Sequence, residues 1–374
     1  MVNISIRYSK GGDIIDKFNA RHLGFIILGV SIVSLKTYPS LMTRNGGRDS
    51  WITLIIASII IFLYAWFMLS SFKKTNTFNL YNIYCGALGK FWGNFLLILF
   101  AITLFLSLVE SASVEANSMH TNMLFEVPSW YILIFFVCPA LYTIKKGKAA
   151  LIITTVISMV LIIISGINLS ILTIKYKKLY YLLPILKDGI RPDIIKSFLQ
   201  FLGLYGCFTI AFAYIEDIQD KNKIVRTSLI SLIFIIQMQI ISIMGIITTF
   251  EIRYLNTMPY PKLLQTQLVE LSRFMESGEF FVMLQILGGW YIKYVLTFYA
   301  LMKILKDLKI YDKYTIYTSS LLVLIAGLAL SQDTFNLFRF LNYYTYICLV
   351  NFVIIPFIMM LIFRIRTVQK NRGQ

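Results

Sequence analysis

The sequence predicts an all-α integral membrane protein, and two observations carry this prediction. Hydrophobic residues make up 58% of the 374 residues and charged residues only 14%, whereas a soluble domain averages about 45–50% and about 25%. Apolar runs of about 20 residues, the length that crosses a bilayer, recur along the chain. Because backbone groups in lipid must hydrogen-bond within their own segment, each run is expected to be a helix. We expect one transmembrane domain over residues 1–374, with short cytoplasmic tails.

Ten apolar segments are long enough to be transmembrane helices. The loops assigned to the inner side carry more lysine and arginine than the outer loops, which places both termini in the cytoplasm. One outer stretch, 174–199, departs from this rule, and we expect it to be an amphipathic segment at the membrane surface. Its basic residues are Lys175, Lys177, Lys178, Lys187, Arg191 and Lys196. The ten segments lie near 22–42, 50–70, 93–122, 129–144, 149–173, 200–218, 227–250, 280–304, 314–331 and 341–363.

Ten spans divide into two sets of five, about 22–173 and about 200–363. An odd number of helices in each half inverts the second half relative to the first, which is the 5+5 inverted-repeat arrangement of many transporters. The first span is interrupted by Lys36-Thr37-Tyr38-Pro39, and the sixth contains Gly203 and Gly206. Paired broken helices at equivalent positions indicate a binding site near the midplane. For the sixth span alone, the alternative is that the glycines serve helix packing.

Composition and motifs exclude several classes of function. The net charge of +17 is spread in short clusters between apolar spans, which is typical of membrane topology and not of a nucleic-acid-binding patch. The four cysteines are scattered without a C-x-x-C motif, so we expect neither a disulfide framework nor a zinc site. The only histidines are His22 and His120, and no H-E-x-x-H, G-x-S-x-G or P-loop motif is present. We expect no enzymatic activity, no metal and no cofactor.

Lys293 is the most informative charge, because it lies near the middle of the eighth span. A charge at that depth costs ~2.5–3.5 kcal/mol on insertion scales, so its side chain should face the protein interior and a partner. Glu110 and Glu115 on the third span are the candidate partners, about 140° apart around a helix. A carboxylate beside Lys293 would form a structural ion pair, whereas one without a partner could carry a proton. Both outcomes stay open at this point.

Three groups of residues resemble a known family. They are Pro39-Ser40-Leu41 followed by Gly47-Arg48-Asp49-Ser50-Trp51-Ile52, then Leu183-Pro184-Ile185-Leu186 with Gly189 and Pro192, and Ile292-Lys293 with Phe298-Tyr299-Ala300. Together they resemble the B subunits of the nutrient germinant receptors of bacterial spores, relatives of amino acid permeases in the amino acid/polyamine/organocation superfamily. The resemblance covers nearly the whole chain. It implies a LeuT-like fold in which helices one and six are broken.

The resemblance also implies where a ligand would bind. Backbone N–H and carbonyl groups freed at the two breaks can hold the carboxylate and amino groups of an amino acid. The residues expected there are Ser34, Lys36, Thr37, Glu110, Gly203, Tyr205, Gly206, Cys207, Tyr291 and Lys293.

The sequence departs from the family's pattern at three points. Ile32-Val33-Ser34-Leu35 lacks the glycines usual before the Leu-Pro segment, and Gly206-Cys207 replaces a Gly-Glu pair. Lys293 lies where sodium-coupled relatives hold a cation, which argues against sodium coupling. Lys36 either provides a fixed positive charge at the site or extends to the outer surface.

Three hypotheses for function follow. The first is a membrane subunit of a germinant receptor in the spore inner membrane, which binds an amino acid or similar nutrient and acts with an A subunit and a lipoprotein C subunit. The second is a stand-alone transporter that moves an amino acid or amine with protons. The third is a channel or scaffold in which the permease site has decayed. The fold alone does not separate them, because function depends on the site.

Overall fold

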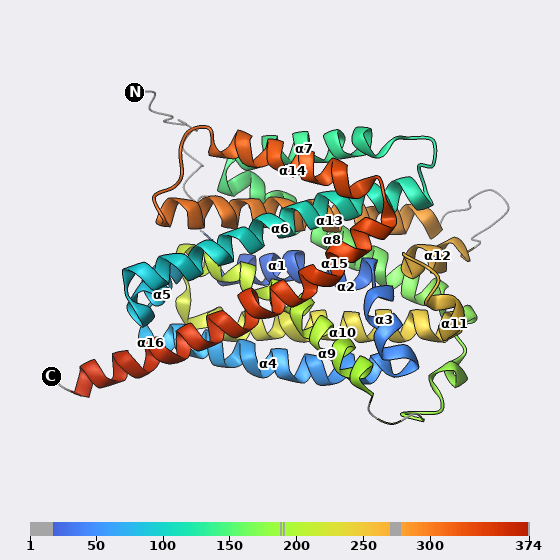
Figure 1. Cartoon of the computed structure of the whole chain (residues 1–374), viewed down its shortest axis with the longest axis horizontal. Coiled ribbons are helices and arrows are strands. Elements are labelled where there is room, and N and C mark those ends of the chain that lie inside the picture. The colour runs from blue at the N-terminus through green and yellow to red at the C-terminus, as the bar shows by residue number, and fades with distance from the viewer. Residues whose placement is uncertain (1–17, 188, 190, 270–277, 373–374) are drawn as a thin grey trace.

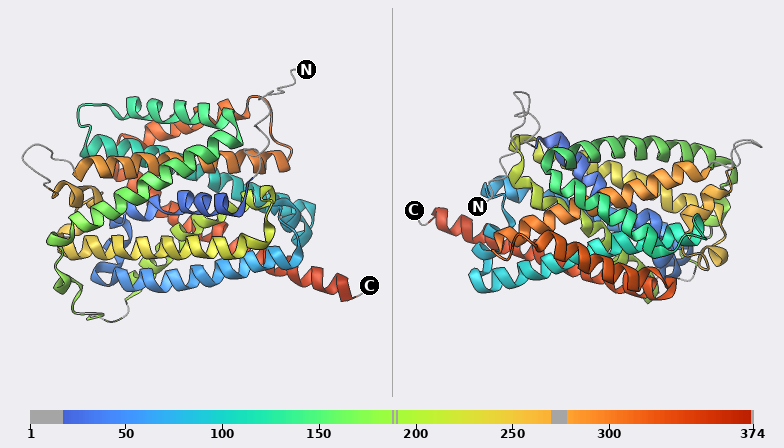
Figure 2. Two further views of the ribbon diagram at one scale, coloured as in Figure 1. Left: turned by 180° about the vertical axis from the view of Figure 1, so that it is seen from behind. Right: turned by 90° about the horizontal axis from the view of Figure 1, so that it is seen from above.

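The computed structural model describes residues 18–187, 189, 191–269 and 278–372, and nearly all of them are helical (Figure 1). Within these residues there is no β-strand, only an isolated parallel bridge between Phe18 and Ile218. The long helices run side by side along the longest axis of the molecule, and α16 projects beyond the bundle in every view (Figure 2). The protein is therefore a helical bundle, as expected from its composition.

The helices of the first half are α1 (Ala20–Ser31), α2 (Val33–Thr37), α3 (Ser40–Gly46), α4 (Ser50–Thr75), α5 (Leu80–Leu88), α6 (Lys90–Asn122), α7 (Ser129–Lys146) and α8 (Lys148–Leu172). Those of the second half are α9 (Pro192–Tyr205), the 3-10 helix η5 (Gly206–Asp217), α10 (Ile224–Thr249), α11 (Ile252–Leu255), α12 (Pro261–Gln267), α13 (Gly278–Asp307), α14 (Thr315–Ser331), α15 (Thr334–Cys348), the π-helix η7 (Leu349–Ile354) and α16 (Ile355–Arg372).

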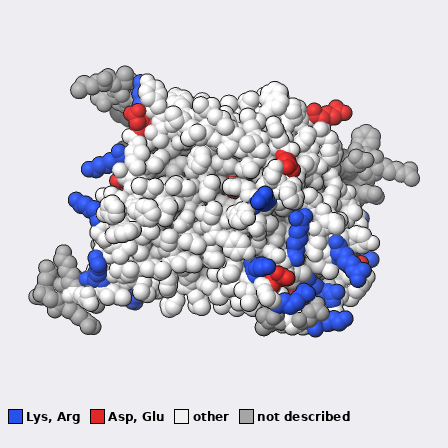
Figure 3. Space-filling view, viewed as in Figure 1, with Lys and Arg blue, Asp and Glu red and all other residues white. Residues whose placement is uncertain are grey.

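Eight helical segments in the described part of the chain are long and apolar enough to cross a membrane. Helices α7 and α14 are shorter and take the places of the fourth and ninth expected spans. At 18 and 17 residues, they extend ~25–27 Å, close to the ~30 Å of a bilayer core. On the face that Figure 3 shows, charged side chains lie at the left and over the right-hand part of the molecule, and an uncharged band separates the two groups. The expected multi-pass architecture is confirmed, while the two repeat ranges remain a prediction.

The first span is broken twice. Helix α1 ends at Ser31 and α2 ends at Thr37, and Tyr38 and Pro39 separate α2 from α3. Proline has no N–H to continue the helical ladder, which explains the second break. At the first break, the side chain of Gln239 on α10 donates a hydrogen bond of 2.8 Å to the carbonyl oxygen of Ile32. A neighbouring helix thus provides a partner for a buried backbone group at the break.

The sixth span changes from α-helix to 3-10 helix at Gly206. Both glycines pack tightly against the tenth span: a Cβ at Gly203 would stand 2.0 Å from the carbonyl oxygen of Thr345, and one at Gly206 would stand 2.8 Å from Cγ2 of Val353. They therefore serve close helix packing. The expected break at this position is present.

The expected start of the sixth span at residue 200 is wrong, because α9 begins at Pro192. Proline is favoured at the first helical position, and Asp193 in the first turn suits the positive end of the helix dipole. The expected amphipathic segment 174–199 is accordingly shorter. Its described part before α9 holds two short 3-10 helices, Ile174–Tyr176 and Leu179–Leu182.

Ion pairs close one end of the bundle, the end that the predicted topology places inside. Asp217, at the end of η5, accepts from Lys148 on α8 at 3.1 Å and from Lys303 on α13 at 3.0 Å. Lys303 also lies 3.1 Å from Glu216. The lysine partners of Glu216 and Asp217 come from helices that are distant in the sequence. This cluster ties the end of the broken sixth span to two other spans.

Candidate functional site

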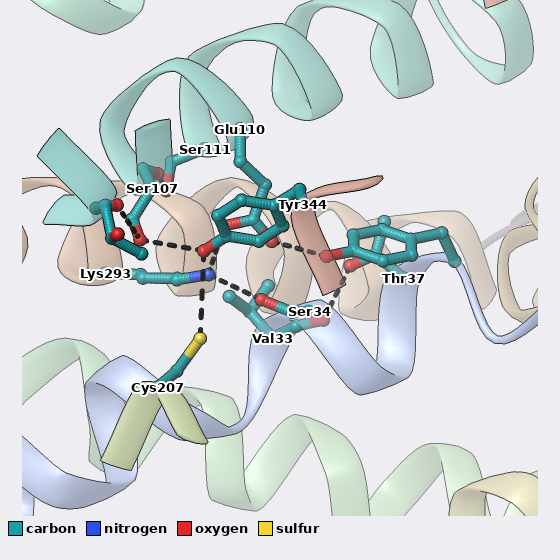
Figure 4. Close-up of polar contacts among 11 residues, drawn as sticks. Val33, Ser34, Thr37, Ser107, Glu110, Ser111, Cys207, Lys293 and Tyr344 are labelled. Carbon is teal, nitrogen blue, oxygen red and sulfur yellow. Dashed lines mark hydrogen bonds and ion pairs between the residues drawn. The ribbon is translucent and has the colours of Figure 1, made fainter. Parts of the chain in front are cut away.

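The centre of the candidate site is an ion pair between Lys293 on α13 and Glu110 on α6 (Figure 4). Both side chains are fully buried, with 0% of their surface exposed. The Lys293 amino group also donates a hydrogen bond of 2.6 Å to the Ser34 hydroxyl on α2. Of the two carboxylates expected as partners, Glu110 is therefore the one that pairs with Lys293. Three spans meet at this point.

The broken first span contacts both members of the ion pair. Tyr38, at the break after α2, donates its hydroxyl hydrogen to Glu110 Oε1 at 2.5 Å. Ser34 and Tyr38 are four residues apart and so lie on the same face of the helical turn. Each thus fixes one charge, Ser34 the ammonium and Tyr38 the carboxylate. A movement of α2 would necessarily disturb the ion pair.

Aromatic and polar side chains enclose the pair. The Trp290 ring centroid lies 5.3 Å from the Lys293 amino nitrogen, within cation–π range, and the Tyr38 ring stacks on Trp290 at 6.2 Å. Tyr344 on α15 shares a hydrogen bond of 2.7 Å with Ser107 on α6. Its hydroxyl is also 3.8 Å from the Cys207 sulfur on η5. The tenth and sixth spans thereby contribute to the same site.

The structure brings together four of the residues expected at the site: Ser34, Glu110, Cys207 and Lys293. Lys36 and Thr37 lie elsewhere, in a pocket formed with α8, α12 and α13. Ser34 and Lys36 are two positions apart, or about 200° around a helix, so they face opposite sides of α2.

Four other expected residues make contacts outside the site. The Tyr205 hydroxyl shares a hydrogen bond of 2.8 Å with Ser58, and the Tyr291 hydroxyl shares one of 2.8 Å with Thr143. Gly203 and Gly206 pack against α15 and η7, as described above.

Sequence reasoning missed Tyr38, Ser107, Trp290 and Tyr344. Tyr38 could have been found, because it lies in the interrupted segment and one turn after Ser34. Ser107 is three residues before Glu110 on an apolar helix, a spacing that puts both on one face. Tyr344 gives no sequence signal, since its place depends on how the tenth span packs.

Glu115 on α6 has a different environment from Glu110. It is 1% exposed, and neither carboxyl oxygen has a hydrogen-bond partner within the described residues. Those residues also contain no group of three His, Cys, Asp or Glu side chains that could hold a metal ion. In the described structure, the site thus holds a paired cation and anion, and the same helix as Glu110 carries a carboxyl group without a partner.

This arrangement defines a class of protein: a multi-pass helical membrane protein of the permease type, whose broken first span closes on a buried ion pair. Solved structures of a manganese transporter from Eremococcus coleocola share the fold. A mutant form aligns with a TM-score of 0.59, and a complex with an aromatic bis-isothiourea substituted compound with one of 0.56. In both, the identity is 12% and the match covers 94% of this chain and 81% of that chain. At this identity the likeness shows the fold alone.

The chain belongs to the spore germination protein family, whose model matches residues 22–337. Spore germination protein XB of Bacillus anthracis is 21% identical over 295 residues, which cover 78% of this chain and 81% of that protein. The resemblance drawn from the sequence motifs is confirmed at the level of the family. Family and fold together give the chain a germination-related or transport role in a membrane, and both are permease-like and not enzyme-like.

Removing one member of the ion pair is expected to destabilise the protein more than removing both. Glu110→Gln leaves the Lys293 charge buried and unpaired, which should cost about 3–5 kcal/mol of unfolding free energy. Adding Lys293→Met removes that charge and should recover most of this free energy. Thermal unfolding of the purified single and double variants measures this coupling. A double variant as unstable as the sum of both single variants would show that the charges do not interact.

Proposed function

We propose that the chain is the membrane subunit of a germinant receptor in the spore inner membrane, where it binds an amino acid or a similar small nutrient. It would act together with an A subunit and a lipoprotein C subunit. Family membership and the permease-type fold support this proposal. The observation that carries it is the buried Lys293–Glu110 pair, both members of which are held by the broken first span.

A zwitterion is the ligand whose chemistry fits this pair. Its carboxylate can take the place of Glu110 beside the Lys293 ammonium, and its ammonium can take the place of Lys293 beside the Glu110 carboxylate. Each buried charge then keeps an opposite charge, which avoids the large cost of an unpaired ion in a low-dielectric interior. The cation–π contacts of Trp290 and Tyr344 with Lys293 add aromatic walls to the site. Neither the missing glycines nor Cys207 prevents this mode of binding, because side chains supply both charges.

Ligand binding can signal only if it favours one of two conformations. Ser34 and Tyr38 hold α2 against the closed ion pair, so opening the pair would change the contacts of the first span. The sixth span contacts the same region through Cys207 and reaches the inner ion pairs through Asp217. These contacts link the proposed binding site to the inner end of the bundle, where partner subunits could sense the change.

Tyr38→Phe tests the proposed site with little change in shape. A hydrogen bond to a charged group is worth about 1.5–3 kcal/mol, so removing one that holds the closed ion pair should shift the half-maximal nutrient concentration for germination by about 10-fold or more. Tyr205→Phe is the matched control, because it removes a buried tyrosine hydroxyl whose partner is Ser58, outside the site. Spores carrying each variant would be germinated across a panel of amino acids.

Immunoblots of spore membranes must show equal amounts of both proteins, and a nutrient sensed by another receptor must act normally on both kinds of spores. Equal dose–response curves for Tyr38→Phe and Tyr205→Phe would refute the proposed site.

The second candidate is a proton-coupled amino acid or amine transporter, which the isolation of Glu115 favours. Burying an ionised carboxylate without a partner is costly, so this group suits the binding and release of a proton. If the chain transports, proteoliposomes that contain it alone should accumulate a labelled amino acid when a proton gradient is applied. Glu115→Gln should abolish that accumulation but leave exchange without a gradient. The receptor proposal instead predicts no accumulation by the chain alone.

A further inference from the structure

A second pocket borders α2 on the side of Lys36, which points away from the ion pair. Three of its lining residues, Val33, Lys36 and Thr37, come from α2, the short helix that also carries Ser34 and is followed directly by Tyr38. The remaining walls come from α1, α8, α12 and α13. The lining residues are Leu28, Gly29, Ile32, Val33, Lys36, Thr37, Met159, Ile162, Lys262, Val282, Gln285, Ile286 and Gly289.

The charges at this pocket are all positive. Lys36 and Lys262 line it, and no acidic residue does so among those the structure describes. In that part of the chain, Lys36 makes no hydrogen bond or ion pair, while Lys262 donates only to the neutral side-chain oxygen of Gln265, at 2.7 Å. Burial, together with the nearby charges of Lys36 and Lys177, lowers the pKa of Lys262 to about 7. Two buried amino groups held together without an acidic partner among the described residues would be stabilised in their charged form by an anion.

Gln285 adds a hydrogen-bond donor to the same pocket. Its side chain is 9% exposed, and its Nε2 atom has no hydrogen-bond partner in the described structure. A buried amide N–H without an acceptor costs free energy, so it calls for a partner that the described residues do not supply. Most other lining side chains are aliphatic. The pocket therefore combines a cationic, hydrogen-bond-donating end with apolar walls.

We propose that this pocket binds a small organic anion, with its carboxylate between Lys36, Lys262 and Gln285 and a short apolar body against Ile32 and Ile286. The described walls offer no carboxylate to receive an ammonium group, so an α-amino acid is a poor ligand here. In this respect the pocket is the opposite of the Lys293–Glu110 site, which offers both charges. The proposal stands independently of the nutrient-binding proposal, because it uses different side chains.

Butyrate is a suitable probe, because it joins one carboxylate to a short apolar chain. Equilibrium binding of labelled butyrate would be measured on the full chain in nanodiscs of neutral lipid, with butylamine and norvaline as competitors. Butylamine tests whether the pocket prefers a negatively charged ligand to a positively charged one. Norvaline tests whether a zwitterion of similar size is a poor ligand. We expect saturable butyrate binding at millimolar concentration, with little competition from either compound. Absence of saturable binding, or equal competition by butylamine, would overturn the proposal.

Substitutions locate the site. Lys36→Met and Lys262→Met should each weaken butyrate binding by about 10-fold, since each removes a charge-assisted contact. Lys36→Arg keeps the charge and should bind within a few-fold of the wild type. Lys175→Met removes an exposed lysine outside the pocket and should have no effect. Both pocket substitutions relieve repulsion between cations, so they should not impair folding; unchanged binding in well-folded variants would refute the assignment.

The same anionic chemistry can also come from a lipid headgroup. Repeating the measurement in nanodiscs of anionic phospholipid separates the two sources. Unchanged butyrate affinity supports a soluble carboxylate as the ligand. Disappearance of butyrate binding only in anionic lipid would overturn the assignment to a soluble ligand. It would indicate that a lipid headgroup occupies the pocket.

Discussion

The buried contact between Lys293 and Glu110 is the constraint on which the centre of the structure depends. Neither charge is exposed to water, and an unpaired ion at that depth would be strongly destabilising. The pair therefore requires α6 and α13 to pack together at one height, and it requires further hydrogen bonds to complete its shell. Ser34 and Tyr38 provide them, which fixes the position of the broken first span. Tyr38 follows the last residue of α2, and the interruption of the helix at Pro39 lets its side chain reach Glu110 on α6.

Helix α2 occupies a central position because its two faces meet different environments. One face contacts the ion pair, and the other lines a pocket with two lysines that have no acidic partner among the described residues. The first face offers a cation and an anion, which suits a zwitterion, and the second offers only cations and a free amide donor, which suits an anion. The five residues of α2, Val33 to Thr37, can contact both environments, because successive positions on a helix point about 100° apart.

Much of this architecture could be predicted from the sequence. Hydropathy gives the ten spans, proline and glycine mark the two interrupted helices, and the cost of burying a charge identifies Lys293 and a carboxylate on the third span. The sequence does not give side-chain directions or partners. Closeness in sequence groups Lys36 with Ser34, but the two side chains point to opposite sides of α2. Gly203 and Gly206 pack closely against the tenth span. The contacts of Tyr344 could not be predicted, because the packing of the tenth span leaves no pattern in a single sequence. Helix α9 begins at Pro192 and not at the expected residue 200. Proline is a helix-start signal that a prediction from hydropathy alone does not include.

The central claim is that a small zwitterionic nutrient binds at the Lys293–Glu110 pair, and equilibrium binding tests it most directly. Each of the twenty amino acids, in labelled form, would be titrated into the purified full chain and into the Glu110→Gln, Lys293→Met double variant, with folding checked by thermal unfolding. The account predicts saturable binding of at least one amino acid to the wild type. Because the double variant cannot form either charge-assisted interaction with that amino acid, its affinity should be lower by about 100-fold or more. Equal affinity of both proteins for that amino acid would contradict the account.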